Sequence, residues 1–453
     1  LDGNESVTLT MDTDSGTVRY AGSATYTGLP AGDVYYNLTF NGSGVWVLDA
    51  PLTVNSNLTI TAGTLDVGAA SSHAVSVAGA FSNTGAFTAR SGTVTMSAAN
   101  GTKIVTAAPA NGAFYNLTLG AGGGTATFSL GADVDVDNNL TIAGGTLSPG
   151  SRTINLGGTW TNNGIFSAGT STVVFDKTSG TQQLDTGGTG DNNDFYNLTV
   201  SAETLQLITS DIAIDATLTV SAAKTFDLNS RSLTAATLVN NGTLQLTGIE
   251  TVAISNMDTD SGTVTYTCSG TYTGLAAGDA YYSLTFNGTG GTWVLDAPLD
   301  VDGDLTITAG TLGVSTSNHA VAVAGSWTND GVFTARAGTV TFNATGTGKT
   351  VAAGASSFYN VVYSGTGGWT ISENLTALND LTLSSCASSG GFIVPSGVTV
   401  TVNGTFSNSV GGSATGWDSG SVLALTRTGG GRYAINSRTG TGDVYGTLWV
   451  GAD

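Results

Sequence analysis

A four-residue phrase, Tyr-Asn-Leu-Thr, recurs at a nearly fixed spacing along this 453-residue chain and limits the folds that it can adopt. The phrase begins at Tyr36, Tyr115 and Tyr196, and variants of it begin at Tyr282 and Tyr359. Such a period, about 80 residues, is typical of stacked arrays, in which each unit buries its apolar face only against its neighbours. The sequence therefore predicts five tandem units, starting near residues 35, 114, 195, 281 and 358.

A second motif and a longer repeat support this period. The segment Met11–Val18 recurs as Met257–Val264, three units later. Copies one and four are therefore close duplicates. An Asn-centred turn recurs with the same period as the Tyr phrase, at Asn83, Asn162, Asn240, Asn329 and Asn408.

Within each unit the apolar residues alternate with Thr, Ser and Asn, as in Leu38 with Phe40 and Leu58 with Ile60. A period of two places the apolar residues on one face of a strand. These runs are short, and Gly, Asn and Asp separate them, as expected for strands joined by turns. A run begins about every 20 residues, which predicts four coils in each unit. We therefore expect an all-β fold, a parallel β-solenoid with coils of about 20 residues that is continuous over residues 1–411.

Composition narrows the functional classes. The chain has 12 basic and 32 acidic residues, a formal net charge of -20, which argues against nucleic acid as a partner. No run approaches the roughly 18 apolar residues of a membrane span, so we expect no membrane insertion in this segment. The chain starts at Leu1 without an initiator Met or a signal peptide, and we interpret it as a mature or excised piece of a larger protein.

Two sets of alternating aspartates are the best chemical candidates. Alternation predicts that the three carboxylates of a set share one strand face, where they repel one another unless solvent or a cation separates them. Because Ca²⁺ takes oxygen ligands in this manner, calcium is the metal that these sets suggest, with a solvated acidic face as the alternative. We expect no other cofactor. The two sets are Asp133, Asp135 and Asp137, and Asp300, Asp302 and Asp304.

The repeated Asn-Leu-Thr phrase has two interpretations. Asn side chains of successive coils can stack into a hydrogen-bonded ladder. The same triplet is also an acceptor sequence for N-glycosylation. The asparagines concerned are Asn37, Asn57, Asn116, Asn139, Asn197 and Asn374.

Catalytic constellations are not evident, and we do not expect an enzyme. The two histidines, His73 and His319, occupy one repeat position in copies one and four, too distant in a solenoid to act together. No Gly-x-Ser-x-Gly elbow, phosphate loop or zinc spacing occurs. A β-helix polysaccharide lyase or hydrolase is the enzymatic alternative, and it would require carboxylates with an Arg or Lys on neighbouring coils. Cys268 and Cys386 are predicted to be free and buried, or one of them to bridge to another chain.

Together, Phe-Tyr-Asn-Leu-Thr, Asn57–Leu65 and Trp160–Gly164 resemble segments of large repetitive surface and adhesin-type proteins of bacteria. The extracellular regions of those proteins are parallel β-helices, akin to filamentous haemagglutinins and autotransporter passengers. The resemblance covers roughly residues 7 to 410. It implies an extracellular or cell-surface location and a role as a fibre, a surface-layer component or an adhesive stalk. An adhesin would bind glycans or other surface proteins through exposed aromatic residues, but the repeated Trp46 and Trp293 are expected in the core.

The last part of the chain, residues 412–453, departs from the repeat and is predicted to be an atypical coil, a cap or a docking segment. Three basic residues lie there, in an otherwise acidic chain. Attraction between this segment and the acidic body of a second copy predicts end-to-end self-association into filaments. The three residues are Arg427, Arg432 and Arg438.

Overall fold

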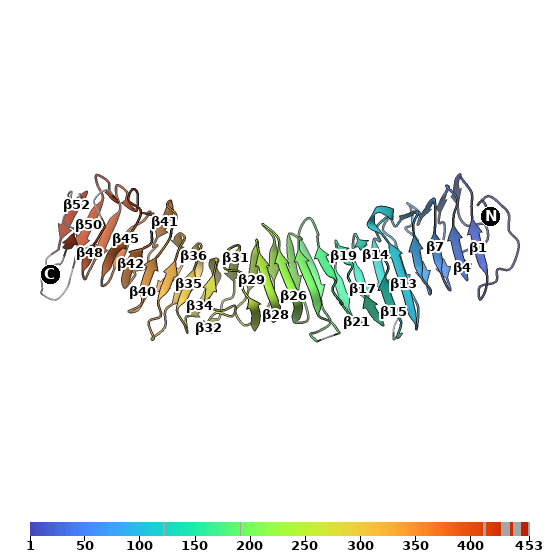
Figure 1. The fold of residues 1–453 in the computed structure, drawn as a ribbon, viewed down its shortest axis with the longest axis horizontal. Coiled ribbons are helices and arrows are strands. Elements are labelled where there is room, and N and C mark those ends of the chain that lie inside the picture. Colours follow the sequence, from blue (N-terminus) through green and yellow to red (C-terminus); the bar gives the residue numbers. More distant parts are fainter. Residues whose placement is uncertain (121–122, 191, 411–413, 427–434, 438–444, 452–453) are drawn as a thin grey trace. The chain divides into compact units, whose positions relative to one another are not determined.

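A computed structural model describes residues 1–120, 123–190, 192–410, 414–426, 435–437 and 445–451. The chain forms two compact units: Leu1–Val239 with Ala253–Asn256, and Asn240–Val252 with Met257–Asp453. Each unit is a parallel β-solenoid, in which strands of successive coils lie side by side (Figure 1). Apart from one short 3₁₀ helix, η1 (Pro109–Asn111), the described elements are strands. The predicted all-β solenoid is confirmed.

The strands of the first unit group into sheets, and their described pairings are parallel. One sheet comprises β1 (Thr17–Tyr20), β4 (Asn37–Phe40), β7 (Leu58–Ile60), β10 (Phe81–Asn83), β13 (Thr102–Ala107), β15 (Thr127–Leu130), β18 (Thr146–Ser148) and β21 (Ile165–Phe166). A second comprises β2 (Thr25–Thr27), β5 (Val45–Val47), β8 (Thr64–Asp66) and β11 (Ala86–Thr88). A third comprises β3 (Val34–Tyr35), β6 (Leu52–Val54), β9 (Val75–Val77), β12 (Thr93–Met96), β14 (Asn116–Leu119), β17 (Leu140–Ile142), β20 (Trp160–Asn162), β23 (Thr181–Asp185), β25 (Thr204–Leu207) and β27 (Thr225–Asp227). A fourth comprises β16 (Val134–Val136), β19 (Thr153–Leu156), β22 (Thr172–Phe175), β24 (Phe195–Val200), β26 (Ile212–Val220), β28 (Leu233–Asn240) and β30 (Val252–Asn256).

The strands of the second unit also group into series of neighbouring parallel strands. One series comprises β29 (Thr243–Leu246), β31 (Thr263–Tyr266), β32 (Thr271–Thr273), β34 (Ser283–Val294), β36 (Leu305–Gly313), β38 (Trp327–Asn329), β39 (Val332–Thr334), β41 (Lys349–Ala352), β43 (Trp369–Ile371), β46 (Phe392–Val394) and β49 (Thr415–Trp417). Another comprises β33 (Ala280–Tyr281), β35 (Leu299–Val301), β37 (Val321–Val323), β40 (Thr339–Phe342), β42 (Asn360–Ser364), β45 (Leu381–Ser385), β48 (Phe406–Asn408) and β51 (Ile435–Ser437). The last comprises β44 (Leu375–Ala377), β47 (Thr399–Val402), β50 (Val422–Leu425) and β52 (Thr447–Val450).

Alternation of apolar and polar residues builds the core. In β7, Leu58 and Ile60 are buried while Thr59 between them lies on the outer face. Leu38 pairs in register with Leu58, and Leu58 pairs with Phe81, so like side chains stack from one coil to the next. Burial of these stacked side chains supplies the main favourable free energy of such a fold.

Aromatic side chains fill the same core places in the two duplicated copies. The ring of Trp46 lies 5.1 Å from that of Phe40, and the ring of Trp293 lies 5.0 Å from that of Phe286. Both tryptophans have no exposed surface, as the sequence predicted. They therefore belong to the core and cannot form an exposed platform for glycans.

The repeat unit does not contain a whole number of coils, contrary to the expected four. Along one sheet the in-register partners run from Leu38 to Leu58, Phe81 and Val105, so the second and third of these coils are longer than the first. Leu117, the repeat equivalent of Leu38, instead pairs with Val94 on a different sheet. Because of the longer coils, a repeat unit ends before its fourth coil is complete. Each new copy in the first unit therefore begins on a different face.

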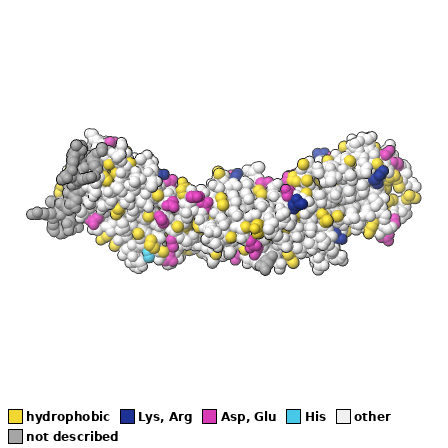
Figure 2. Space-filling model, in the orientation of Figure 1, with side chains coloured by type: hydrophobic (Ala, Val, Ile, Leu, Met, Phe, Trp, Pro, Cys, Tyr) yellow, Lys and Arg dark blue, Asp and Glu magenta, His cyan; other side chains and the backbone are white. Residues whose placement is uncertain are grey.

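The surface carries few charges for its size. Figure 2 shows acidic and basic side chains scattered over the visible face, most of which is neither charged nor hydrophobic. In the described ranges, no helix is long and apolar enough to cross a membrane.

Candidate functional site

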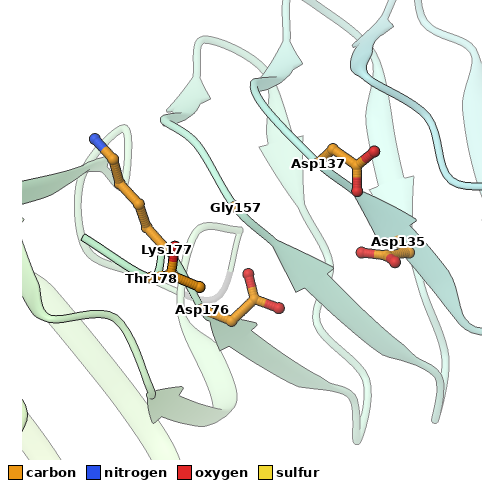
Figure 3. A pocket seen from close by; sticks show the side chains of 6 residues that line it. All are labelled: Asp135, Asp137, Gly157, Asp176, Lys177 and Thr178. Atoms are coloured by element: carbon orange, nitrogen blue, oxygen red, sulfur yellow. The ribbon is translucent and has the colours of Figure 1, made fainter. Parts of the chain in front are cut away.

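An acidic pocket of about 300 Å³ lies on the first unit, and successive coils line it (Figure 3). Three of its lining side chains are carboxylates. The lining residues are Asp135, Asp137, Gly157, Asp176, Lys177 and Thr178.

Register explains why these residues meet. Val136 of β16 pairs with Leu156 of β19, and Leu156 pairs with Phe175 of β22. The residue that follows each of these strands therefore occupies one position in three successive coils: Asp137, then Gly157, then Asp176. The Gly157 N–H donates to the Val136 carbonyl (2.9 Å), and the Asp176 N–H donates to the Leu156 carbonyl (3.0 Å).

Gly157 lies between Asp137 and Asp176, and its lack of a side chain creates the pocket between their carboxylates. A β-carbon at this position would lie 2.4 Å from the backbone carbonyl oxygen of Asp137. That approach is far inside van der Waals contact, so a larger residue would displace the neighbouring coil. The absence of a side chain leaves space between Asp137 and Asp176, which lie two coils apart.

The carboxylates repel one another. Partial burial raises the pKa of Asp135, and the nearby charges of Asp137 and Asp176 raise it further. Partial burial also raises the pKa of Asp176, with a smaller contribution from Asp137. The Lys177 ammonium donates to the Thr181 carbonyl (2.9 Å) and points away from the acidic side chains in Figure 3. Among the described residues, no ion pair neutralises the pocket.

The structure brings together only part of the first predicted aspartate set. Asp135 and Asp137 line the pocket, whereas Asp133 accepts a hydrogen bond from the Thr153 N–H (2.9 Å) at the start of the next coil. Asp176 completes the pocket and was not among the residues predicted from the sequence. Two signals pointed to it: it follows the last apolar residue of a strand, as Asp137 does, and its distance from Asp137 along the chain is close to two coils.

In the second predicted aspartate set, as in the first, one carboxylate accepts a hydrogen bond from the backbone of the next coil. Asp304 accepts a hydrogen bond from the Ser326 N–H (2.7 Å) of the next coil. Partial burial raises the pKa of Asp300, and the charge of Asp302 adds to the effect. No group of three or more His, Cys, Asp or Glu side chains in the described ranges has the geometry of a metal site. Calcium binding at either set stays a prediction.

The repeated asparagines mostly bind backbone groups, not one another. The side-chain carbonyl of Asn37 accepts from the Asn57 N–H (3.1 Å), and that of Asn57 accepts from the Ala80 N–H (2.8 Å). The side-chain carbonyls of three others accept hydrogen bonds from backbone N–H groups of the following coil in the same way, namely those of Asn116, Asn139 and Asn374. The side-chain amide of Asn197 instead donates to the Thr172 hydroxyl (3.4 Å). A direct side-chain link joins Asn138 Nδ2 to Asn116 Oδ1 (2.9 Å). Glycosylation of these residues stays a prediction.

The remaining candidates lie apart from the pocket. Cys268 and Cys386 are free, as predicted, but both are partly exposed, so the prediction that they are buried is wrong. The Tyr272 hydroxyl donates to the Cys268 thiol. That hydrogen bond lowers the pKa of Cys268. The predicted docking residues Arg427, Arg432 and Arg438 lie outside the described residues.

Comparison with known proteins adds no relative. No protein-family model matches the sequence, and searches of curated proteins and of solved structures return no match.

Proposed function

We propose that this chain is a structural β-solenoid of an extracellular fibre, filament or surface layer. One observation carries the proposal: the recurring residues are those that hold one coil to the next. In the first copy of the repeated phrase, Leu38 stacks in the core on Leu58, and Asn37 accepts the backbone N–H of Asn57. Selection for stacking alone accounts for such a repeat, and a binding or catalytic role is not needed to explain it.

Self-association is the partner interaction that this role implies. An acidic surface resists non-specific association, so assembly requires a complementary patch. The sequence supplies positive charge near the end of the chain, at Arg427, Arg432 and Arg438. The extracellular location rests on the resemblance to bacterial surface proteins.

Negative-stain electron microscopy and sedimentation of the purified chain test this proposal. We expect filaments or ordered arrays at low ionic strength that dissociate in about 1 M salt, where the screening length falls to about 3 Å. Replacing the three arginines with Glu should abolish assembly, while replacing Lys103, Lys224 and Lys349 with Glu, an equal change in charge, should leave it intact. Single particles at every ionic strength would contradict the proposal.

The acidic pocket favours a second candidate function, hydrolysis of a polysaccharide. Asp137 and Asp176 lie two coils apart, which places their backbones about 10 Å apart at the ordinary interstrand spacing. This backbone distance is close to the roughly 6.5–9.5 Å that separates the two carboxyl groups of inverting glycosidases. The raised pKa of Asp176 suits a general acid, and Asp137 would activate water. Release of reducing ends from a panel of soluble polysaccharides, lost in both Asp137→Asn and Asp176→Asn, is the expected result. No release by the unmodified chain would exclude this candidate.

A further inference from the structure

Seven Asn-Gly dipeptides occur in the chain, and each is a chemical site for spontaneous deamidation. The backbone nitrogen of the glycine can attack the side-chain carbonyl carbon of the preceding asparagine, because glycine has no β-carbon to hinder the approach. The reaction requires that nitrogen to be free to move and to lose its proton. The seven asparagines are Asn41, Asn100, Asn111, Asn163, Asn241, Asn287 and Asn403.

Hydrogen bonds hold the glycine nitrogen in four of the seven. A nitrogen that donates its proton to a fixed acceptor is neither free to move nor easily deprotonated. The four bonds run from Gly112 to the Pro109 carbonyl (3.1 Å), from Gly164 to Asn162 Oδ1 (3.0 Å), from Gly242 to Asn240 Oδ1 (3.3 Å) and from Gly404 to the Asn379 carbonyl (2.8 Å).

Close packing holds the glycine in two more. Gly42 and Gly288 are both buried. A β-carbon on Gly42 would lie 2.1 Å from the Gly22 carbonyl oxygen, and one on Gly288 would lie 1.9 Å from the Cys268 carbonyl oxygen. The backbone of the preceding coil therefore confines these two glycines.

Asn100-Gly101 differs from all six. Both residues are exposed in the turn before β13, and the Gly101 N–H has no partner within the described part of the chain. Gly101 has φ +71°, and the only atom near the position of its β-carbon is Lys103 Nζ, at 3.9 Å. The duplicated copy has Gly346-Thr347 at the equivalent positions, so the reactive pair is present in one copy and absent from the other.

We propose that Asn100 is a site of selective deamidation in the folded protein. The Gly101 nitrogen attacks Asn100 Cγ, a C–N bond forms, and the Cγ–Nδ2 bond breaks. Nδ2 leaves as ammonia with the proton lost by the Gly101 nitrogen, and a five-membered imide remains. Water then adds across one of the two imide C–N bonds and yields aspartate or isoaspartate. The product adds one negative charge beside Lys103.

Peptide mass spectrometry of the folded chain, incubated in mildly alkaline buffer at 37 °C, tests the proposal. We expect Asn100 to convert about tenfold faster than the other six sites, a difference of about 1.4 kcal/mol in barrier. Isoaspartate at residue 100 should be the main product detected by fragmentation. Asn100→Gln should abolish the signal while leaving the circular dichroism spectrum unchanged.

The same incubation in denaturant separates structure from sequence. All seven glycines are free in the unfolded chain, so the seven rates should converge. Native conversion of Asn41, Asn163 or Asn241 as fast as that of Asn100 would overturn the proposal. An advantage of Asn100 that persists undiminished in denaturant would also overturn it, because local sequence would then explain the rate.

Discussion

Arg90→Ala removes an ion pair that joins two adjacent coils of the first unit. Asp66 ends β8, and Arg90 lies just after β11, the strand that pairs with it. Arg90 Nε donates to Asp66 Oδ1 (3.1 Å), and Nη2 donates to Asp66 Oδ2 (2.7 Å). The Asp66 side chain is 9% exposed and the Arg90 side chain is 43% exposed. The substitution would leave a nearly buried carboxylate with the Gly68 N–H (2.9 Å) as its remaining hydrogen-bond donor among those described.

The expected loss of stability lies between two limits. Exposed ion pairs contribute about 0–1 kcal/mol, and breaking a fully buried pair costs about 3–5 kcal/mol. Because the arginine is almost half exposed, water screens the pair and lowers its contribution. We therefore expect Arg90→Ala to lower the local free energy of opening by about 1–2 kcal/mol.

The duplicated copy provides the matched control. Arg336 is the equivalent of Arg90, but Gly313 stands in place of Asp66. Arg336→Ala should therefore change stability by less than about 0.5 kcal/mol. A β-carbon on Gly313 would lie 3.7 Å from Thr334 Cβ, an ordinary contact, so Gly313→Asp has room to create the missing pair. Gly313→Asp should stabilise the second unit only when Arg336 is retained.

Hydrogen exchange measured by mass spectrometry reads each unit separately. Arg90 lowers the pKa of Asp66, and a carboxylate with a lowered folded-state pKa stabilises the fold above its unfolded pKa of about 3.9. That contribution is lost as the pH falls through the folded pKa. The difference between Arg90→Ala and the unmodified chain should therefore shrink below about pH 4. Equal effects of Arg90→Ala and Arg336→Ala, or a difference that acid does not reduce, would show that the Asp66–Arg90 ion pair does not stabilise the first unit.

Three further predictions concern the core and the pocket. Tyr281→Phe removes a buried hydroxyl that hydrogen-bonds to the Tyr266 hydroxyl (3.0 Å), and should lower the free energy of unfolding by about 1–2 kcal/mol in urea titrations. Gly157→Ala should cost about 1–3 kcal/mol by the same assay because its β-carbon overlaps the adjacent coil, whereas Gly346→Ala, with no atom within 4 Å, should be nearly neutral. Asp176→Asn should stabilise the first unit at neutral pH, because a raised folded-state pKa means that ionisation of Asp176 opposes folding. Thermal melts should show that this gain in stability disappears below about pH 4, where the Asp176 carboxyl is protonated in both the folded and the unfolded state.

Local patterns sufficed to predict the fold class. Alternation in runs such as Leu58–Ile60 depends only on the side-chain period of a strand, and the recurrent phrase at Tyr36 and Tyr115 indicates stacking of similar units. Both signals lie within short stretches of chain, so they can be read without coordinates. The placement of Trp46 in the core follows from the same argument and is confirmed.

The composition of the acidic pocket could not be read from local patterns. Alternation grouped Asp133 with Asp135 and Asp137, but Asp133 binds the backbone of the next coil and Asp176 takes its place in the pocket. Coil lengths vary along this solenoid, and a small error in each coil accumulates over the coils that follow. Which distant residues share a face therefore depends on the length of every intervening turn.

The division between local and long-range information has one physical origin. Whether a side chain points inward depends on the backbone conformation of a few adjacent residues, which the chain carries wherever it lies. The partner that it meets on the next coil depends on hydrogen-bond register across a whole coil, and packing of the entire core selects that register. The strands and their buried faces could thus be predicted from the sequence. Only the tertiary structure shows that Leu117 lies on a different sheet from its repeat equivalent Leu38, and that Asp137 and Asp176 line one pocket.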